Sequence, residues 1–150
     1  RLEAFTLAAV GRPSMDTEVA AVRAGLVACV LVLVVLAAPY VLLTDPSGLG
    51  AYYAAGPIGA GALVLLAPIE VVALLSGTRG QADPSTAAGV ATVVGLAIAL
   101  VALLWATGVD SNLVFSFPAA DSWIENHRWV VVAASVLVPG SALAWARTVV

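Results

Sequence analysis

The sequence contains no lysine, and its basic residues are six arginines spread along 150 positions. Charged residues make up 10% of the chain, whereas an average soluble protein contains about 25%. The net charge is −3. A protein that binds nucleic acid needs clustered positive charge to meet the phosphates. The composition therefore predicts that nucleic acid is not a partner.

Residues that usually hold cofactors are also scarce, because the chain has one cysteine, one methionine and one histidine. No disulfide can form within the chain, and an axial pair of histidine or methionine ligands for haem is missing. The sequence contains no nucleotide-binding or zinc-protease motif in a suitable context. We therefore expect no cofactor, no metal and no enzymatic activity. Cys29 lies in an apolar run, where a small buried hydrophobic role is expected.

What the sequence does contain is apolar residues, which form 62% of it and give a mean hydropathy of +1.07. A chain this short cannot hide so much apolar surface from water. A helix needs about 20 apolar residues to cross about 30 Å of hydrocarbon. Four segments qualify, at about residues 19–43, 57–76, 86–107 and 123–147. Their continuous apolar runs exclude the alternating pattern of barrel strands. The predicted fold class is all-α: one polytopic membrane domain with an up-down bundle of four transmembrane helices.

Local patterns predict several helix boundaries. Pro57 suits the first position of the second helix, and Asp83 can cap the third. Ser122 and Glu125 have the spacing of a capping box before the fourth. Residues 1–14 precede the first span and are predicted to be a non-native or disordered extension.

The positions of the arginines predict the orientation of the bundle. With the N-terminus in the cytoplasm, one arginine, Arg128, lies outside, and the inside holds Arg1, Arg12, Arg23, Arg79 and Arg147. This distribution satisfies the positive-inside rule, so both termini are predicted to face the cytoplasm. Four aromatic residues then fall near the outer interface, where aromatic belts occur: Tyr52, Tyr53, Trp123 and Trp129.

Small residues recur at every fourth position of two spans. The first span carries two such rows, Ala20-Ala24-Ala28 and Ala21-Gly25-Cys29, and the third carries Ala91-Gly95-Ala99. Because lipid gives helices no hydrophobic reason to associate, rows that permit close backbone approach favour helix contacts. We expect these rows to be contact faces.

Glu70 is the main candidate for function because an ionisable group inside a span is costly to bury. Arg23 lies in the preceding span. Since the two helices are antiparallel and closely connected, Arg23 and Glu70 are predicted to form an intramembrane ion pair. Two alternatives remain open: Glu70 extends to the cytoplasmic interface, or it forms a proton or cation site. The apolar third span argues against a polar pore.

A second polar cluster, Asp121, Glu125 and His127, lies on the predicted outer face. A metal site is conceivable, but the spacing does not place the three side chains on one helix face. The competing hypothesis is a solvated helix start, with Arg128 and Trp129 anchoring it among the lipid headgroups.

Three short stretches carry a resemblance to a known group of proteins: Ala82-Asp83-Pro84 through Ala88-Gly89, Leu104-Trp105-Ala106 and His127-Arg128-Trp129. With them the chain resembles haloarchaeal four-helix integral membrane proteins of unknown function. The resemblance implies membrane location and no catalytic activity.

Together these observations predict a multi-pass protein of the cell membrane that acts as a structural or accessory component of a larger membrane assembly. Its partners would be the lipid bilayer and another membrane protein or further copies of the chain. The alternative is a small transporter or ion-coupled carrier that uses Glu70. A third class, an enzyme acting on lipid at the interface, would have to use Asp121, Glu125 and His127.

Overall fold

The computed structural model describes residues 15–150, which form helices and turns without a strand in that range. The four long helices are α2 (Met15–Leu42), α4 (Gly61–Thr78), α5 (Pro84–Gly108) and α7 (Ile124–Val149). Each is long and apolar enough to cross a membrane. The predicted all-α fold with four spans is therefore confirmed. The predicted extension, residues 1–14, lies outside the described residues.

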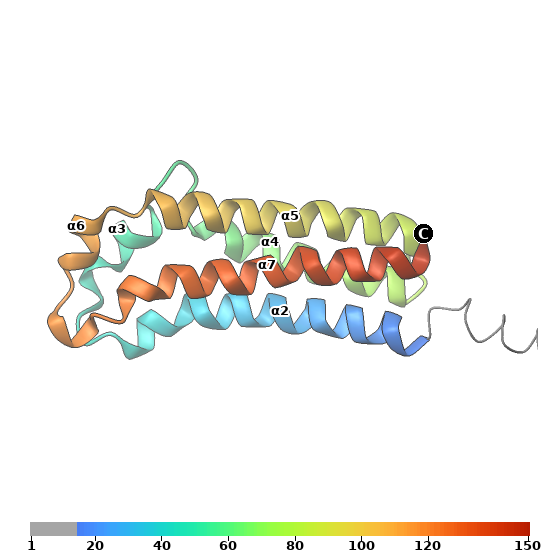
Figure 1. Ribbon diagram of the computed structural model, residues 1–150, viewed down its shortest axis with the longest axis horizontal. Helices are drawn as coiled ribbons and strands as arrows, with labels where there is room; N and C mark the ends of the chain where they lie inside the picture. The colour runs from blue at the N-terminus through green and yellow to red at the C-terminus, as the bar shows by residue number, and fades with distance from the viewer. Residues whose placement is uncertain (1–14) are drawn as a thin grey trace, which may run out of the picture.

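The long helices alternate in direction and form an up-down bundle (Figure 1). Contacts join α2 to α4, α4 to α5, α5 to α7 and α7 to α2, so α4 and α7 face each other diagonally. The start of α2 and the end of α7 lie at the same end of the bundle, which we call the terminal end. The membrane side that this end faces stays a prediction.

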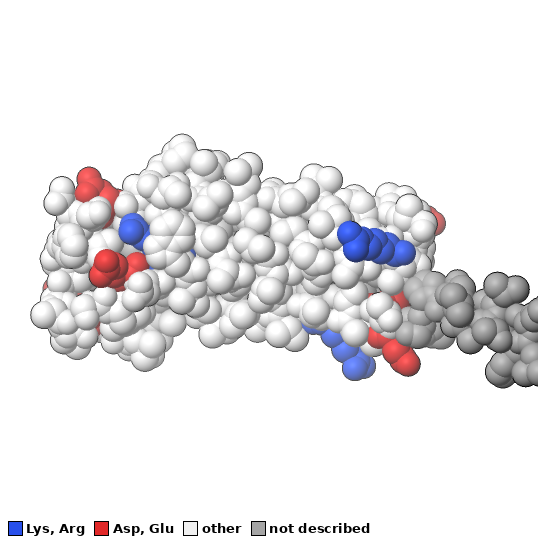
Figure 2. Space-filling view, viewed as in Figure 1, with Lys and Arg blue, Asp and Glu red and all other residues white. Residues whose placement is uncertain are grey.

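The opposite end, which we call the loop end, carries the short helices. There η1 (Pro46–Gly48) and α3 (Leu49–Tyr53) follow α2, whereas α6 (Ser111–Phe115) and η2 (Ala119–Asp121) join α5 to α7. Charged side chains on the face shown in Figure 2 gather at the two ends and leave an uncharged middle. This distribution is the one that a surface surrounded by lipid requires.

The cap predicted for the third span is confirmed. The Asp83 carboxylate accepts a hydrogen bond from the Thr86 N–H at 3.1 Å, and Pro84 occupies the first turn of α5. The capping box predicted at Ser122 and Glu125 is wrong, because α7 has no side-chain cap. The Glu125 N–H instead bonds the backbone carbonyl of Ser122.

Pro57 does not begin the second spanning helix, which starts at Gly61. Gly56 and Gly59 flank Pro57 with φ angles of 75° and 77°. These left-handed conformations suit glycine and interrupt a right-handed helix. The predicted start of this helix at Pro57 is therefore four residues before its observed start at Gly61.

One of the two small-residue rows on α2 faces the interior. Ala21, Gly25 and Cys29 are buried, and a Cβ at Gly25 would lie 2.9 Å from a Leu74 methyl and 3.0 Å from the Ser141 hydroxyl. In the other row, Ala28 is buried, but its first two members, Ala20 and Ala24, face outward. The prediction of two contact faces on this helix is therefore correct within the bundle for one face only.

The predicted row on α5 also lies at a helix contact. Ala91 and Gly95 are buried, and Ala99 is half-buried. A Cβ at Gly95 would lie 3.0 Å from the Pro139 backbone of α7. Close backbone approach of this kind stabilises helix pairs in lipid, where dispersion contacts replace the hydrophobic effect.

Candidate functional site

Glu70 lies in the middle of α4, nine residues after Gly61 and eight before Thr78. At 1.5 Å per residue, either helix end is about 12–14 Å away. The side chain is 0% exposed, and neither carboxyl oxygen has a hydrogen-bond partner among the described residues. Extension of Glu70 to an interface is therefore excluded by its burial.

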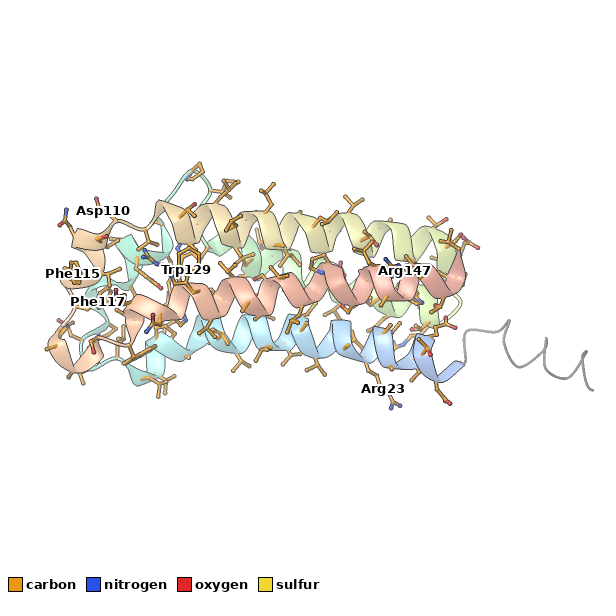
Figure 3. The ribbon with its side chains drawn as sticks, viewed as in Figure 1. Arg23, Asp110, Phe115, Phe117, Trp129 and Arg147 are labelled. Carbon is orange, nitrogen blue, oxygen red and sulfur yellow. The ribbon has the colours of Figure 1, made fainter. Side chains whose placement is uncertain are left out.

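Arg23 does not pair with Glu70, so the predicted ion pair is wrong. Its side chain is exposed and points away from the bundle (Figure 3). Within residues 15–150, no polar atom forms a hydrogen bond with the Glu70 oxygens.

Depth and rotation both explain why this pair fails. Gly25 lies level with Leu74, so Arg23 is six residues, or about 9 Å, nearer the terminal end than Glu70. The residue of α2 that lies level with Glu70 is the buried Cys29, because each is four residues toward the loop end from the contact between Gly25 and Leu74. Arg23 precedes Cys29 by six residues, which turns it about 120° around the helix.

Ser135 is a second buried polar group without a partner. Its side chain on α7 is 0% exposed, and its hydroxyl has no hydrogen-bond partner in the described part of the chain. Most buried polar groups in proteins are hydrogen-bonded. Glu70 and Ser135 are the two residues in the middle of the described bundle whose buried side-chain polar atoms have no hydrogen-bond partner, so the fold does not explain their presence there.

The predicted polar cluster on the outer face is not one site. Asp121 is buried and fixes the end of α2: its carboxylate accepts bonds from the Thr44 hydroxyl at 2.7 Å and the Thr44 N–H at 3.2 Å. Glu125 is exposed, and His127 points into the bundle. No group of three or more His, Cys, Asp or Glu side chains able to hold a metal occurs within residues 15–150.

His127 is a bridge between helices. Its Nε2 lies 2.7 Å from the Val35 carbonyl oxygen, and its Nδ1 lies 3.0 Å from the Tyr52 hydroxyl. A carbonyl only accepts, so Nε2 carries the proton and donates. In the neutral ring Nδ1 then accepts, and the Tyr52 hydroxyl donates to it.

Pro39 explains why the Val35 carbonyl is available. A helical N–H normally bonds the carbonyl four residues earlier, and proline has no N–H. Pro39 therefore leaves the Val35 carbonyl free inside α2, and His127 of α7 supplies the missing donor. The sequence offered a clue to this bridge, because a proline within a span always frees the carbonyl four positions before it.

Tyr52 is at the centre of an aromatic cluster at the loop end, although the sequence predicted it in an interfacial belt. It is 0% exposed, its carbonyl accepts from the Trp105 indole N–H at 2.9 Å, and its ring contacts those of Trp105, Phe117 and His127. Burial raises the pKa of the Tyr52 phenol, so it remains a protonated donor.

Arg128 and Trp129 lie beside this cluster on α7, where Figure 3 shows Trp129 near the loop end. Trp129 is exposed, and the Arg128 guanidinium carbon lies 5.5 Å from its ring centroid. Arg128 also donates to the Val109 carbonyl at 2.9 Å. The pair occupies the position expected of an interfacial anchor.

Comparison with known proteins shows the family that the chain resembles. A family model described as a family of unknown function, DUF7548, matches residues 15–150. No curated protein and no solved structure matches the chain. The matched residues cover all four spans, while the haloarchaeal source predicted from the sequence stays a prediction.

Proposed function

The chain belongs to DUF7548, a family of unknown function, and we propose that it is a structural or accessory component of a larger assembly in the cell membrane. The proposal gives the chain no catalytic activity of its own. Its partner is a membrane protein or a second copy of the chain.

The observation that carries the proposal is a set of small residues left on the outside of the bundle. Ala20 and Ala24 of α2 are exposed, as are Gly140 and Ala144 of α7. A Cβ at Gly140 would meet nothing within 4 Å. Other exposed positions on these helices include larger side chains, such as Val27 on α2 and Leu137 on α7. Small residues on a lipid-facing surface permit another helix to approach closely.

The two groups of small residues lie on neighbouring helices and at similar depth. Gly25 contacts Ser141 across the α2–α7 interface. Ala24 and Gly140 are the chain neighbours of this pair, so they lie within about two residues, or about 3 Å, of one level. A partner helix at the terminal half of the bundle would therefore meet short side chains on both α2 and α7.

The hydrogen bonds that the loop-end polar residues make within the chain also support an accessory role. The carboxylate of Asp121 and both ring nitrogens of His127 are used within the chain. A lipid-modifying enzyme built on these residues would need them free to reach substrate.

The test is purification of the tagged full-length chain from its native membranes in a mild detergent. We expect a partner to co-purify, and we expect the double change Ala20→Leu and Ala24→Leu to remove it. Val30→Leu is the matched control, because Val30 is an exposed residue of the same helix whose bulk is already large. Recovery of a lone monomer would contradict the proposal, as would a partner retained by the double variant.

An ion-coupled carrier is the second candidate function, and the isolation of Glu70 favours it. An ionisable residue inside a membrane span commonly marks an ion pathway or a proton relay. Reconstitution into liposomes with an internal pH dye tests this function. Proton-linked flux lost in Glu70→Gln would support it, and absence of flux from the wild-type chain would count against it.

A further inference from the structure

We propose that Glu70 and Ser135 form an internal proton-binding site in the middle of the membrane, in which Glu70 is a neutral carboxylic acid bridged to the Ser135 hydroxyl by buried water. The ligand is a proton together with that water. A carrier would require such a site, but the inference does not rest on either proposed function.

The first step concerns the charge of Glu70. An ionised carboxylate inside a protein must be compensated by a cation or by several hydrogen bonds, and without them the group takes up a proton. Neither oxygen of Glu70 has a hydrogen-bond partner among the described residues. The surroundings of this group therefore favour the neutral acid.

The helices packed around Glu70 bring no cation to it. On α2 the residue level with Glu70 is the buried Cys29, while Arg23 points outward. The α5 segment contains no Asp, Glu, Lys, Arg or His. On α7, His127 and Arg128 are engaged at the loop end, and Arg147 is exposed at the terminal end.

The second step concerns depth. A Cβ at Gly25 would contact both Leu74 of α4 and Ser141 of α7, which places these two residues at one level. Glu70 lies four residues from Leu74 toward the loop end, and Ser135 lies six from Ser141 in the same direction. The two polar groups therefore differ in depth by about 3 Å.

The third step concerns what can satisfy them both. A carboxylic acid offers an O–H donor and a carbonyl acceptor, and a serine hydroxyl both donates and accepts. Buried water typically makes two to four hydrogen bonds with polar groups that the protein leaves unpaired. Water between α4 and α7, which face each other diagonally, gives partners to both groups without a direct contact.

Infrared spectroscopy of the full chain, reconstituted in liposomes at neutral pH, tests the site. A protonated carboxyl has a C=O stretching band that carboxylates lack, and exchange into heavy water shifts it. We expect this band in the wild-type chain and its loss in Glu70→Gln. Glu125→Gln is the matched control, because Glu125 is exposed, and it should leave the band unchanged. A wild-type chain without the band, or a band that survives in Glu70→Gln, would overturn the proposal.

The water bridge has its own test. Ser135→Ala should shift the Glu70 band, since the carboxyl loses its hydrogen-bonded connection to the hydroxyl. Ser141→Ala should not, because the Ser141 hydroxyl already donates to the Val138 carbonyl at 2.8 Å. An identical band position in wild-type and Ser135→Ala protein would remove Ser135 from the site. Circular dichroism of each variant establishes that the helices are intact. The infrared results and the co-purification of a partner are independent, so this site and the proposed accessory function can fail separately.

Discussion

The loop end and the middle of the bundle treat buried polar groups in opposite ways. At the loop end, Asp121 bonds Thr44, and His127 bonds both Tyr52 and the carbonyl freed by Pro39. In the middle, Glu70 and Ser135 have no partners within the described chain. The loop end has an exception in the Nε of Arg128. The contrast indicates that polar groups at the loop end join the helices, whereas those in the middle make no hydrogen bond between helices of the described chain.

Truncation of His127, which forms the loop-end bridge, should give the largest effect on stability. His127→Ala leaves the Val35 carbonyl and the Tyr52 hydroxyl buried without partners and opens a cavity. We expect a loss of about 3 kcal/mol in the free energy of unfolding. Thermal unfolding in detergent measures it. Glu125→Ala, an exposed change two residues away, should stay within about 0.5 kcal/mol of wild type.

A second change isolates the role of proline in this bridge. Pro39→Ala restores an N–H that can bond the Val35 carbonyl within α2. In a double-mutant cycle, His127→Ala should therefore cost less in the Pro39→Ala background than in wild type. Strictly additive losses would mean that the freed carbonyl is not what His127 stabilises.

The next prediction compares an interior glycine with a lipid-facing one. A Cβ at Gly77 would lie 2.5 Å from the Trp145 ring and 2.7 Å from the Ala87 Cβ, whereas one at Gly140 would meet nothing within 4 Å. Gly77→Ala should therefore destabilise the bundle by about 2 kcal/mol through overpacking. Gly140→Ala should be neutral or slightly stabilising, because alanine favours the helix. Equal melting temperatures for the two variants would contradict the packing at the terminal end.

These results separate what sequence could predict from what it could not. The four spans follow from apolar runs, and Asp83 follows from a local capping pattern, so each depends on neighbours in the chain. The pairing of Arg23 with Glu70 depended on rotation and axial offset between two helices. An apolar helix that is hydrophobic all round gives no periodic pattern to fix its rotation.

The loop-end bridge was hidden for a related reason. His127 and Tyr52 lie 75 residues apart in the sequence. Their contact requires α3 to lie beside the start of α7. Proximity in the sequence instead grouped Asp121, Glu125 and His127, although their spacing did not place the three side chains on one helix face. The fold separates these three because α7 begins at Ile124, which leaves Asp121 in the preceding turn and outside the helical spacing.

Removal of the Glu70 carboxyl should change the free energy of unfolding in the opposite direction to truncation of His127 at the loop end. Glu70→Leu replaces a polar group that has no hydrogen-bond partner within the described chain with an apolar one of similar size, and we expect a gain of about 1 kcal/mol in the free energy of unfolding. The comparison variant is Val72→Leu, a lipid-facing change on α4 that should have no effect. A loss comparable to that of His127→Ala would show that Glu70 has a strong partner in the folded bundle.

The smallest effect should come from the aspartates that cap short-range structure at the two ends. Hydrogen bonds from Ser85 and then Thr86 lower the pKa of Asp83 at the terminal end, and those from Ser47 lower the pKa of Asp45 at the loop end. A carboxyl whose pKa is lower in the folded state stabilises the fold above its unfolded pKa, about 3.9. This contribution is lost as the pH falls through the folded value.

Because both carboxyls are exposed and local, their contributions should be small and should not distinguish the two ends. Asp83→Asn and Asp45→Asn keep an oxygen acceptor that does not titrate. Each variant should therefore lose less melting temperature than wild type between neutral pH and about pH 3, and the double variant should show the sum of the two changes. An acid sensitivity that remains in full in the double variant would assign it to other carboxyls. The loop end and the middle of the bundle would then also differ in their response to acid. The buried Asp121 at the loop end would be the next carboxyl to change.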